Sequence, residues 1–148
     1  MPLDGTLPGS ALAELPERSF SVYLHVPFCR SRCGYCDFNT YTASELRGMS
    51  TGDYLTAALR EIDLAARVLG GGTPEVNTVF VGGGTPTMLP AGELSRILDA
   101  VRERFGLVRD AEITTEANPE TVTPEYLRRL REAGFTRISL GMQSAVPH

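Results

Sequence analysis

The sequence has no run of apolar residues that approaches the roughly 18–20 needed to cross a bilayer. Its first residues do not combine a basic stretch with an apolar one, as a secretory signal would. Positive charge is not in excess either, because 14 basic and 18 acidic residues give a net charge of −4. A basic surface for phosphate groups is therefore not expected, which disfavours a nucleic-acid partner. We expect a cytoplasmic protein.

Cysteine is scarce, with three in 148 residues, all within the segment C-R-S-R-C-G-Y-C that starts at Cys29. An odd number of cysteines on one loop argues against a disulfide framework. Structural thiols buried in a core would lie in apolar stretches, whereas these are separated by polar residues and glycine. A structural zinc site takes four ligands, and His25 is the one nearby side chain that could complete it. Zinc is therefore a minor alternative.

The cysteine spacing favours an iron–sulfur cluster. Four cysteines usually hold a four-iron cluster, and Cys29, Cys33 and Cys36 are one ligand short of that number. The missing ligand leaves one iron free to bind a small molecule, and we expect the reaction to take place at this iron.

Two regions are expected along the chain. Residues 1–19 contain several prolines and glycines without a hydrophobic period, and are interpreted as a flexible leader. Residues 20–148 alternate between strand-like and helix-like segments. The expected strands are 21–26, 76–81, 112–116 and 137–140, and the expected helices are 53–69, 91–105 and 124–133. This order, with no sign of a hairpin, predicts an α/β fold with a parallel sheet and right-handed crossovers.

The predicted fold is incomplete at its C-terminus. Four strands with three helices are half of an eight-stranded barrel or two thirds of a six-stranded one, and residues 141–148 begin a connection that leads to no further element. We expect the last strand to present an unpaired edge. We also expect the chain, if produced alone, to aggregate or stay partly molten rather than melt in two states.

The segments that follow parallel strands all emerge at the carboxyl edge of the sheet, where α/β proteins bind ligands. The distinctive residues of the chain fall there, namely the three cysteines, Gly82–Thr85, Glu116 with Asn118, and Gln143. The pentapeptide G-G-G-T-P occurs twice, at 70–74 and 82–86, and only the second copy follows a strand. Glycines there let the backbone approach a ligand closely and offer it N–H and C=O groups.

Simpler interpretations are open for several of these residues. The second glycine run is equally consistent with a structural turn, Glu116 with a solvated carboxylate, and Gln143 with an exposed loop side chain. Tyr23 and His25 share the strand face opposite the valines and leucine that should meet the helices, so they are expected to look into a barrel. An interior hydrogen-bonded histidine is preferred for His25 over a metal ligand.

Four motifs taken together resemble the radical S-adenosylmethionine (SAM) superfamily. They are Y-L-H-V-P-F-C-x3-C-x-Y-C-D-F at 23–38, G-G-G-T-P-T at 82–87, E-x-N-P at 116–119 and L-G-M-Q-S at 140–144. The resemblance covers about residues 20–144 and lies in the branch of the oxygen-independent coproporphyrinogen III oxidases and related haem chaperones. It implies that the chain is the N-terminal part of a partial TIM barrel built from parallel βα repeats.

The resemblance implies that Cys29, Cys33 and Cys36 hold three irons of a [4Fe–4S] cluster, whose fourth iron is chelated by the amino and carboxylate groups of SAM. An electron donor would reduce the cluster, which would cleave SAM to methionine and a 5′-deoxyadenosyl radical. The implied SAM contacts are Gly84 and Glu116 at the amino group, Gly83 and Thr85 in the same pocket, Gln143 at the ribose, Tyr23 near the sulfonium, and Tyr35 beside a nucleotide or a second SAM.

Phe38 separates two functions within this branch. The coproporphyrinogen III oxidases carry a further cysteine two residues after the third one, whereas C-D-F-N at 36–39 resembles the haem chaperones. The resemblance thus favours a protein that binds haem through a region beyond this chain and transfers it to haem-accepting proteins. Oxidative decarboxylation of coproporphyrinogen III is the alternative, and a zinc-binding structural domain is a remote one.

Overall fold

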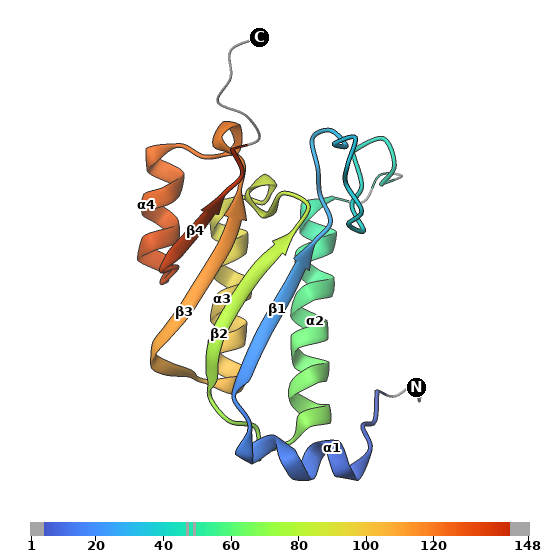
Figure 1. Cartoon of the computed structure of the whole chain (residues 1–148), viewed down its shortest axis with the longest axis vertical. Helices are drawn as coiled ribbons and strands as arrows, with labels where there is room; N and C mark the ends of the chain where they lie inside the picture. Colours follow the sequence, from blue (N-terminus) through green and yellow to red (C-terminus); the bar gives the residue numbers. More distant parts are fainter. Residues whose placement is uncertain (1–4, 47, 49, 143–148) are drawn as a thin grey trace.

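The computed structural model of the chain describes residues 5–46, 48 and 50–142. Four parallel strands form one sheet in the order β1-β2-β3-β4. Their bounds are Phe20–Val26 for β1, Val76–Gly83 for β2, Leu107–Ala117 for β3 and Arg137–Leu140 for β4. The helices that alternate with them are α2 (Thr51–Leu69), α3 (Ala91–Phe105) and α4 (Pro124–Ala133) (Figure 1). The predicted α/β fold with a parallel sheet is confirmed.

The core lies between the sheet and these helices. Strand residues such as Val79 and Ile113 pack there against Leu94 and Leu98 of α3 and Leu130 of α4, each at most 4% exposed. The apolar positions of the helices recur at spacings of three and four, so each helix presents one apolar side to the sheet. The opposite face of the sheet carries the polar positions of the strands and is not covered by these helices (Figure 1).

Local capping residues set the helix ends. Helix α2 begins at a capping box, in which the Ser50 side chain accepts from the backbone N–H of Asp53 and the Asp53 carboxylate accepts from that of Ser50. This places its start two residues before the predicted one. Helix α4 follows Thr123, whose side chain accepts from the N–H of Tyr126, and ends at Gly134 in the left-handed region (φ 108°).

The segment before β1 differs from the expectation of an irregular leader. It contains a short helix, α1 (Gly9–Glu14), followed by a 3₁₀ turn, η1 (Leu15–Glu17). The prolines at its two ends were interpreted as breakers, but Pro8 lies just before α1 and Pro16 lies in the first turn of η1, positions where a missing N–H costs nothing. The residues between them are mainly alanine, leucine and glutamate, which favour a helix.

The carboxyl edge of the sheet carries the irregular segments. The glycine run continues β2 to Gly83, after which the 3₁₀ turn η2 (Pro86–Met88) leads to α3. A similar turn, η3 (Pro119–Thr121), follows β3. Between β1 and α2 lies the connection that carries the cysteines. None of the helices that the structure describes is long and apolar enough to cross a membrane.

Candidate functional site

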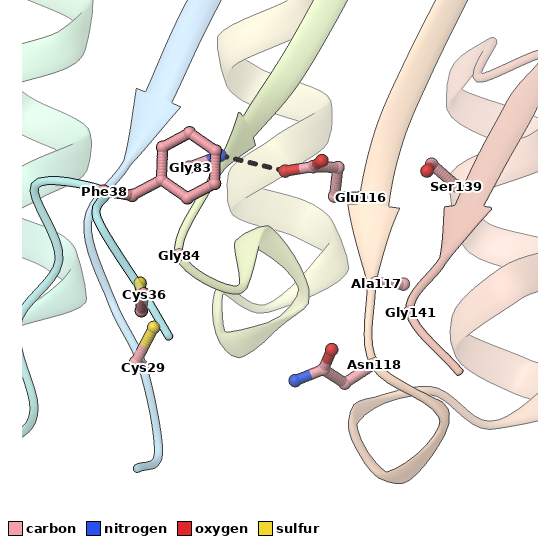
Figure 2. Close-up of a pocket in the computed structure, with 10 residues that line it drawn as sticks. All are labelled: Cys29, Cys36, Phe38, Gly83, Gly84, Glu116, Ala117, Asn118, Ser139 and Gly141. Atoms are coloured by element: carbon pink, nitrogen blue, oxygen red, sulfur yellow. Dashed lines mark hydrogen bonds between the residues drawn. The ribbon is translucent and has the colours of Figure 1, made fainter. Parts of the chain in front are cut away.

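A pocket of about 180 Å³ lies where the four strands end (Figure 2). Its walls come from the connection after β1, from β2 and β3 with the residues that follow them, and from β4 with Gly141. The lining residues are Cys29, Cys36, Phe38, Gly83, Gly84, Glu116, Ala117, Asn118, Ser139 and Gly141. The predicted convergence of segments at the carboxyl edge is confirmed for the residues that the structure describes.

Two of the three cysteines face this pocket. Figure 2 shows Cys29 and Cys36 on one wall, with Glu116 and Asn118 on the other. Cys33 is exposed and does not line the pocket, although its carbonyl accepts a 3.1 Å hydrogen bond from the N–H of Cys36. Within the described part of the chain, no three metal-ligating side chains are gathered closely enough to hold a metal ion. The three-cysteine ligand set therefore stays a prediction.

Two backbone hydrogen bonds join the beginning of the cysteine loop to its end. The N–H of Cys29 donates to the carbonyl of Tyr41 (3.0 Å), and the N–H of Tyr41 donates to the carbonyl of Pro27 (2.7 Å). Inside the loop, Arg32 donates to the carbonyl of Thr40 (2.7 Å) and to the carboxylate of Glu45. These contacts join the two ends of the loop that carries Cys29 and Cys36.

His25, on β1, forms a hydrogen bond with the same loop. Its Nε2 lies 2.8 Å from the carbonyl of Asn39, which can only accept, so Nε2 carries the hydrogen. In the neutral imidazole Nδ1 then accepts, and the hydroxyl of Tyr23, 2.9 Å away, donates to it. With both ring nitrogens engaged, His25 is a hydrogen-bonded histidine, which is the interpretation preferred from the sequence.

The glycine run brings β2 against the cysteine loop. A Cβ added at Gly84 would lie 2.5 Å from the carbonyl oxygen of Phe28 and 2.9 Å from Sγ of Cys29. The N–H of Gly84 donates to the carbonyl of Val26 (2.8 Å), and that of Thr85 donates to the carbonyl of Phe28 (2.7 Å). The expectation that these N–H groups are offered to a ligand is wrong for Gly84 and Thr85, because the carbonyls of Val26, at the end of β1, and of Phe28, just after it, already accept from them.

Glu116 brings a half-buried carboxylate to the pocket from the end of β3. The N–H of Gly83 donates to its Oε2 (3.0 Å), which fixes the carboxylate at the pocket wall (Figure 2). Its negative charge also acts on Tyr23, which does not line the pocket. Burial is the larger cause that raises the pKa of Tyr23, and the charge of Glu116 is the second. Glu116 is thus a half-buried strand-end carboxylate with one oxygen hydrogen-bonded to the backbone, and its role as a SAM contact stays a prediction.

Asn118 belongs to a polar network at the ends of β2 and β3. This residue is named in the sequence analysis only as part of the E-x-N-P motif. Its Nδ2 donates to Oγ1 of Thr85 (3.3 Å), which links the segment after β3 to the segment after β2. A second link joins the hydroxyls of Thr87 and Thr121, 2.5 Å apart. The place of Asn118 at the carboxyl end of a strand indicates a site residue. Its contact with Thr85 could not be predicted, because the two residues are 33 positions apart in the sequence.

Three other predicted SAM contacts that the structure describes, Tyr23, Tyr35 and Thr85, do not line the pocket. Tyr23 is 57% exposed on the uncovered face of the sheet, where its ring stacks on Phe80. Tyr35 is 71% exposed on the cysteine loop. Thr85 contacts the pocket indirectly through Asn118, and Gln143 lies outside the described residues. Five lining residues are not among the predicted ligand contacts, namely Phe38, Ala117, Asn118, Ser139 and Gly141. Of these, Ser139 is the register partner of Glu116.

The residues of this pocket fit a [4Fe–4S] cluster with SAM. Two thiol sulfurs supply the soft ligands that iron–sulfur clusters take, and the third thiol is on the same loop. Because residue 84 is glycine, the carbonyl of Phe28 and Sγ of Cys29 can approach its backbone more closely than any side chain would allow. Across the pocket, Glu116 offers the negative charge that an ammonium group requires.

Comparison with known proteins gives consistent matches. The profile of the Radical SAM superfamily matches residues 23–148. A protein named heme chaperone HemW from Mycobacterium tuberculosis is 55% identical over 95% of this chain and 35% of its own length. HemW from Escherichia coli is 42% identical over 84% of this chain and 32% of its own length. The oxygen-independent coproporphyrinogen III oxidase of E. coli is 37% identical over 90% of this chain and 28% of its own length.

A solved structure has the same fold. The coproporphyrinogen III oxidase HemN from E. coli, described as a radical SAM enzyme, superposes with a TM-score of 0.81 at 36% identity, over 93% of this chain and 31% of that chain. The chain spans about a third of the length of the curated relatives it matches. The site geometry, the family profile and the shared fold agree, and the chain belongs to the radical SAM superfamily.

Proposed function

We propose that the protein carrying this chain binds a [4Fe–4S] cluster and SAM at the pocket where the strands end, and that it works as a haem chaperone. The observation that carries the proposal is the placement of Cys29 and Cys36 in one pocket with Glu116 and the side-chain-free Gly84. When bound, such a cluster supplies the electron that cleaves the sulfonium of SAM. Three free cysteines suit a reducing compartment such as the cytoplasm, which is part of the same proposal.

The residues of the chain have separate tasks in this proposal. Cys29, Cys33 and Cys36 hold three irons. Glu116 receives the ammonium group of SAM, and the Gly83 N–H keeps its carboxylate in place. Gly83, Gly84 and Thr85 shape the pocket, Gln143 meets the ribose, Tyr23 approaches the sulfonium, and Tyr35 flanks a nucleotide or a second SAM.

Phe38 supports haem transfer over decarboxylation. It lines the pocket next to Cys36, at the position where the resemblance places a further cysteine in the coproporphyrinogen III oxidases. The relatives named heme chaperone reach 55% identity, against 37% for the oxidase. In this proposal haem binds through a region beyond this chain and passes to haem-accepting proteins.

Oxidation of coproporphyrinogen III is the second candidate, because the solved structure that shares this fold is such an oxidase. The experiment that separates the two uses the full-length protein, reconstituted anaerobically with iron and sulfide and supplied with SAM, reductant and coproporphyrinogen III. A haem chaperone leaves the coproporphyrinogen unchanged but transfers bound haem to an apo-protein acceptor. Formation of protoporphyrinogen would overturn the chaperone proposal in favour of the oxidase.

A further inference from the structure

Thr40 is one of the few polar side chains buried in this fold, with 3% of its surface exposed. A buried hydroxyl is destabilising unless it has a hydrogen-bond partner. The partner in this structure is Sγ of Cys36, which lies 3.7 Å from Oγ1 of Thr40. The hydroxyl thus meets one of the two cysteine sulfurs that face the pocket.

The chemistry of a metal-bound sulfur fixes the direction of this hydrogen bond. Cysteine ligates iron as a thiolate, which has no hydrogen to donate. The threonine hydroxyl has one hydrogen and can direct it at the sulfur. Thr40 therefore donates and Cys36 accepts whenever Cys36 serves as a ligand.

Neighbouring contacts hold Thr40 in place. Its carbonyl accepts from Arg32 (2.7 Å), and the same guanidinium bonds to Glu45. Hydrogen bonds from Thr42 and the charge of Arg32 lower the pKa of Glu45, so this anchor stays ionised at neutral pH. The next residue, Tyr41, pairs with the backbone of residues 27 and 29. The loop backbone thus sets where the hydroxyl points.

On the basis of the function proposed above, we propose that Thr40 is a positioning residue of the cluster site, whose hydroxyl donates to the Cys36 thiolate and raises the reduction potential of the bound cluster. A donor at a ligand sulfur withdraws negative charge, and the reduced cluster carries one negative charge more than the oxidised one. The hydrogen bond therefore stabilises the reduced form more.

The test uses the full-length protein reconstituted anaerobically, as wild type, Thr40→Val and Thr40→Ser. Valine keeps the size of the side chain and removes the hydroxyl, whereas serine keeps the hydroxyl. We expect Thr40→Val to fold normally by circular dichroism, to have a more negative reduction potential and to bind iron roughly tenfold more weakly, the lower end of the usual loss for such partners. Thr40→Ser should restore both values.

Thr114→Val is the matched control. Thr114 is also a buried threonine with a hydrogen-bonded hydroxyl, but its partners are Glu112 and Arg137 and not a cysteine. The cluster of the Thr114→Val variant should have the same reduction potential as that of wild type. The proposed role of the hydroxyl would be overturned by a reduction potential that is unchanged in Thr40→Val. It would also be overturned if Thr40→Ser, which keeps the hydroxyl, lost the cluster. A wild-type protein that assembles no cluster would instead overturn the proposed function itself.

Discussion

At Gly84 the absence of one methyl group decides how closely the cysteine loop approaches β2. The two nearest atoms to an added Cβ, at 2.5 and 2.9 Å, are a backbone carbonyl oxygen and the sulfur of Cys29, and neither is the free end of a flexible side chain. A substitution there must move the loop or the strand. The residue thus links the stability of the fold to the geometry of the pocket.

We predict that Gly84→Ala destabilises the protein by about 1–3 kcal/mol, the usual cost of forcing an extra carbon into a packed site. Cluster assembly should fall as well, because Cys29 is displaced. Urea unfolding and the iron content after reconstitution measure the two effects. Gly92→Ala is the control, since a Cβ at Gly92 meets nothing within 4 Å and lies in α3, where alanine is favoured by up to about 1 kcal/mol. Equal stability of the two variants would contradict this account of the glycine run.

The carboxylate of Glu116 can be tested without disturbing the strand that carries it. Glu116→Gln keeps an oxygen that can accept from the N–H of Gly83 but removes the negative charge. SAM should bind roughly ten- to hundredfold more weakly, because a charge-assisted hydrogen bond contributes about 1.5–3 kcal/mol. Titration of the reconstituted protein with SAM gives the affinity, and the visible absorption of the cluster should be unchanged. An affinity equal to that of wild type would exclude Glu116 as the contact for the ammonium group.

Among the elements, α4 depends on few buried side chains. It has ten residues, and Leu130 is its one fully buried side chain, at 1% exposure. Leu127 lies one turn earlier and is 36% exposed. The helix therefore offers a matched pair of leucines that differ mainly in burial.

We predict that Leu130→Ala costs about 2–5 kcal/mol of unfolding free energy, the range for truncating a buried leucine. Leu127→Ala should cost much less, because a large part of that side chain is already in contact with water. Chemical denaturation of the full-length variants measures both values. Similar losses at the two positions would mean that α4 does not pack on the sheet through Leu130.

Helix α2 is joined to β1 by the hydroxyl of Tyr54, which donates to the carbonyl of His25 (2.8 Å). Burial is the main cause that raises the pKa of Tyr54 from its ordinary value of 10.0 to about 12. The folded state therefore holds this proton more tightly than the unfolded state. The resulting stabilisation is complete below pH 10 and is lost as the pH rises from about 10 to about 12.

We predict that Tyr54→Phe reduces this alkaline loss of stability, measured by urea unfolding at several pH values between 9 and about 12. Tyr126→Phe should reduce it too, because burial and the charge of Glu93 raise the pKa of Tyr126. The double variant should show the smallest dependence on pH. A slope as steep as that of wild type in the double variant would contradict the assigned burial of these hydroxyls.

Elements set by local signals could be predicted from the sequence. The bounds of α3 and β4 and the N-cap Thr123 follow from periodicity and capping within a few residues. The predicted start of α2 is two residues late, because Asp53 is the third residue of the helix and closes a capping box with Ser50. The strand β3 was predicted too short, since Arg109 and Asp110 interrupt its apolar pattern. Such polar residues are tolerated where the strand is exposed.

For the whole molecule, the arrangement of the site could be predicted in outline but not in its contacts. Parallel topology alone brings the segments after the strands to one edge, which predicts that Cys29, Cys36, Gly84 and Glu116 share a pocket. The partners of those residues are long-range. Thr40 meets Cys36 where the loop closes on Pro27, and the N–H groups of Gly84 and Thr85 turn toward the protein because the carbonyls of Val26 and Phe28 lie beside them. No spacing in the sequence encodes these approaches.

The central claim is that the pocket at the carboxyl edge holds an iron–sulfur cluster with a position open to SAM. Electron paramagnetic resonance of the full-length protein, reconstituted anaerobically and reduced, tests it directly. The account predicts a cluster signal that shifts when SAM is added, and no cluster signal in Cys36→Ala. A wild-type signal that SAM leaves unchanged, or zinc without sulfide in the purified protein, would contradict it.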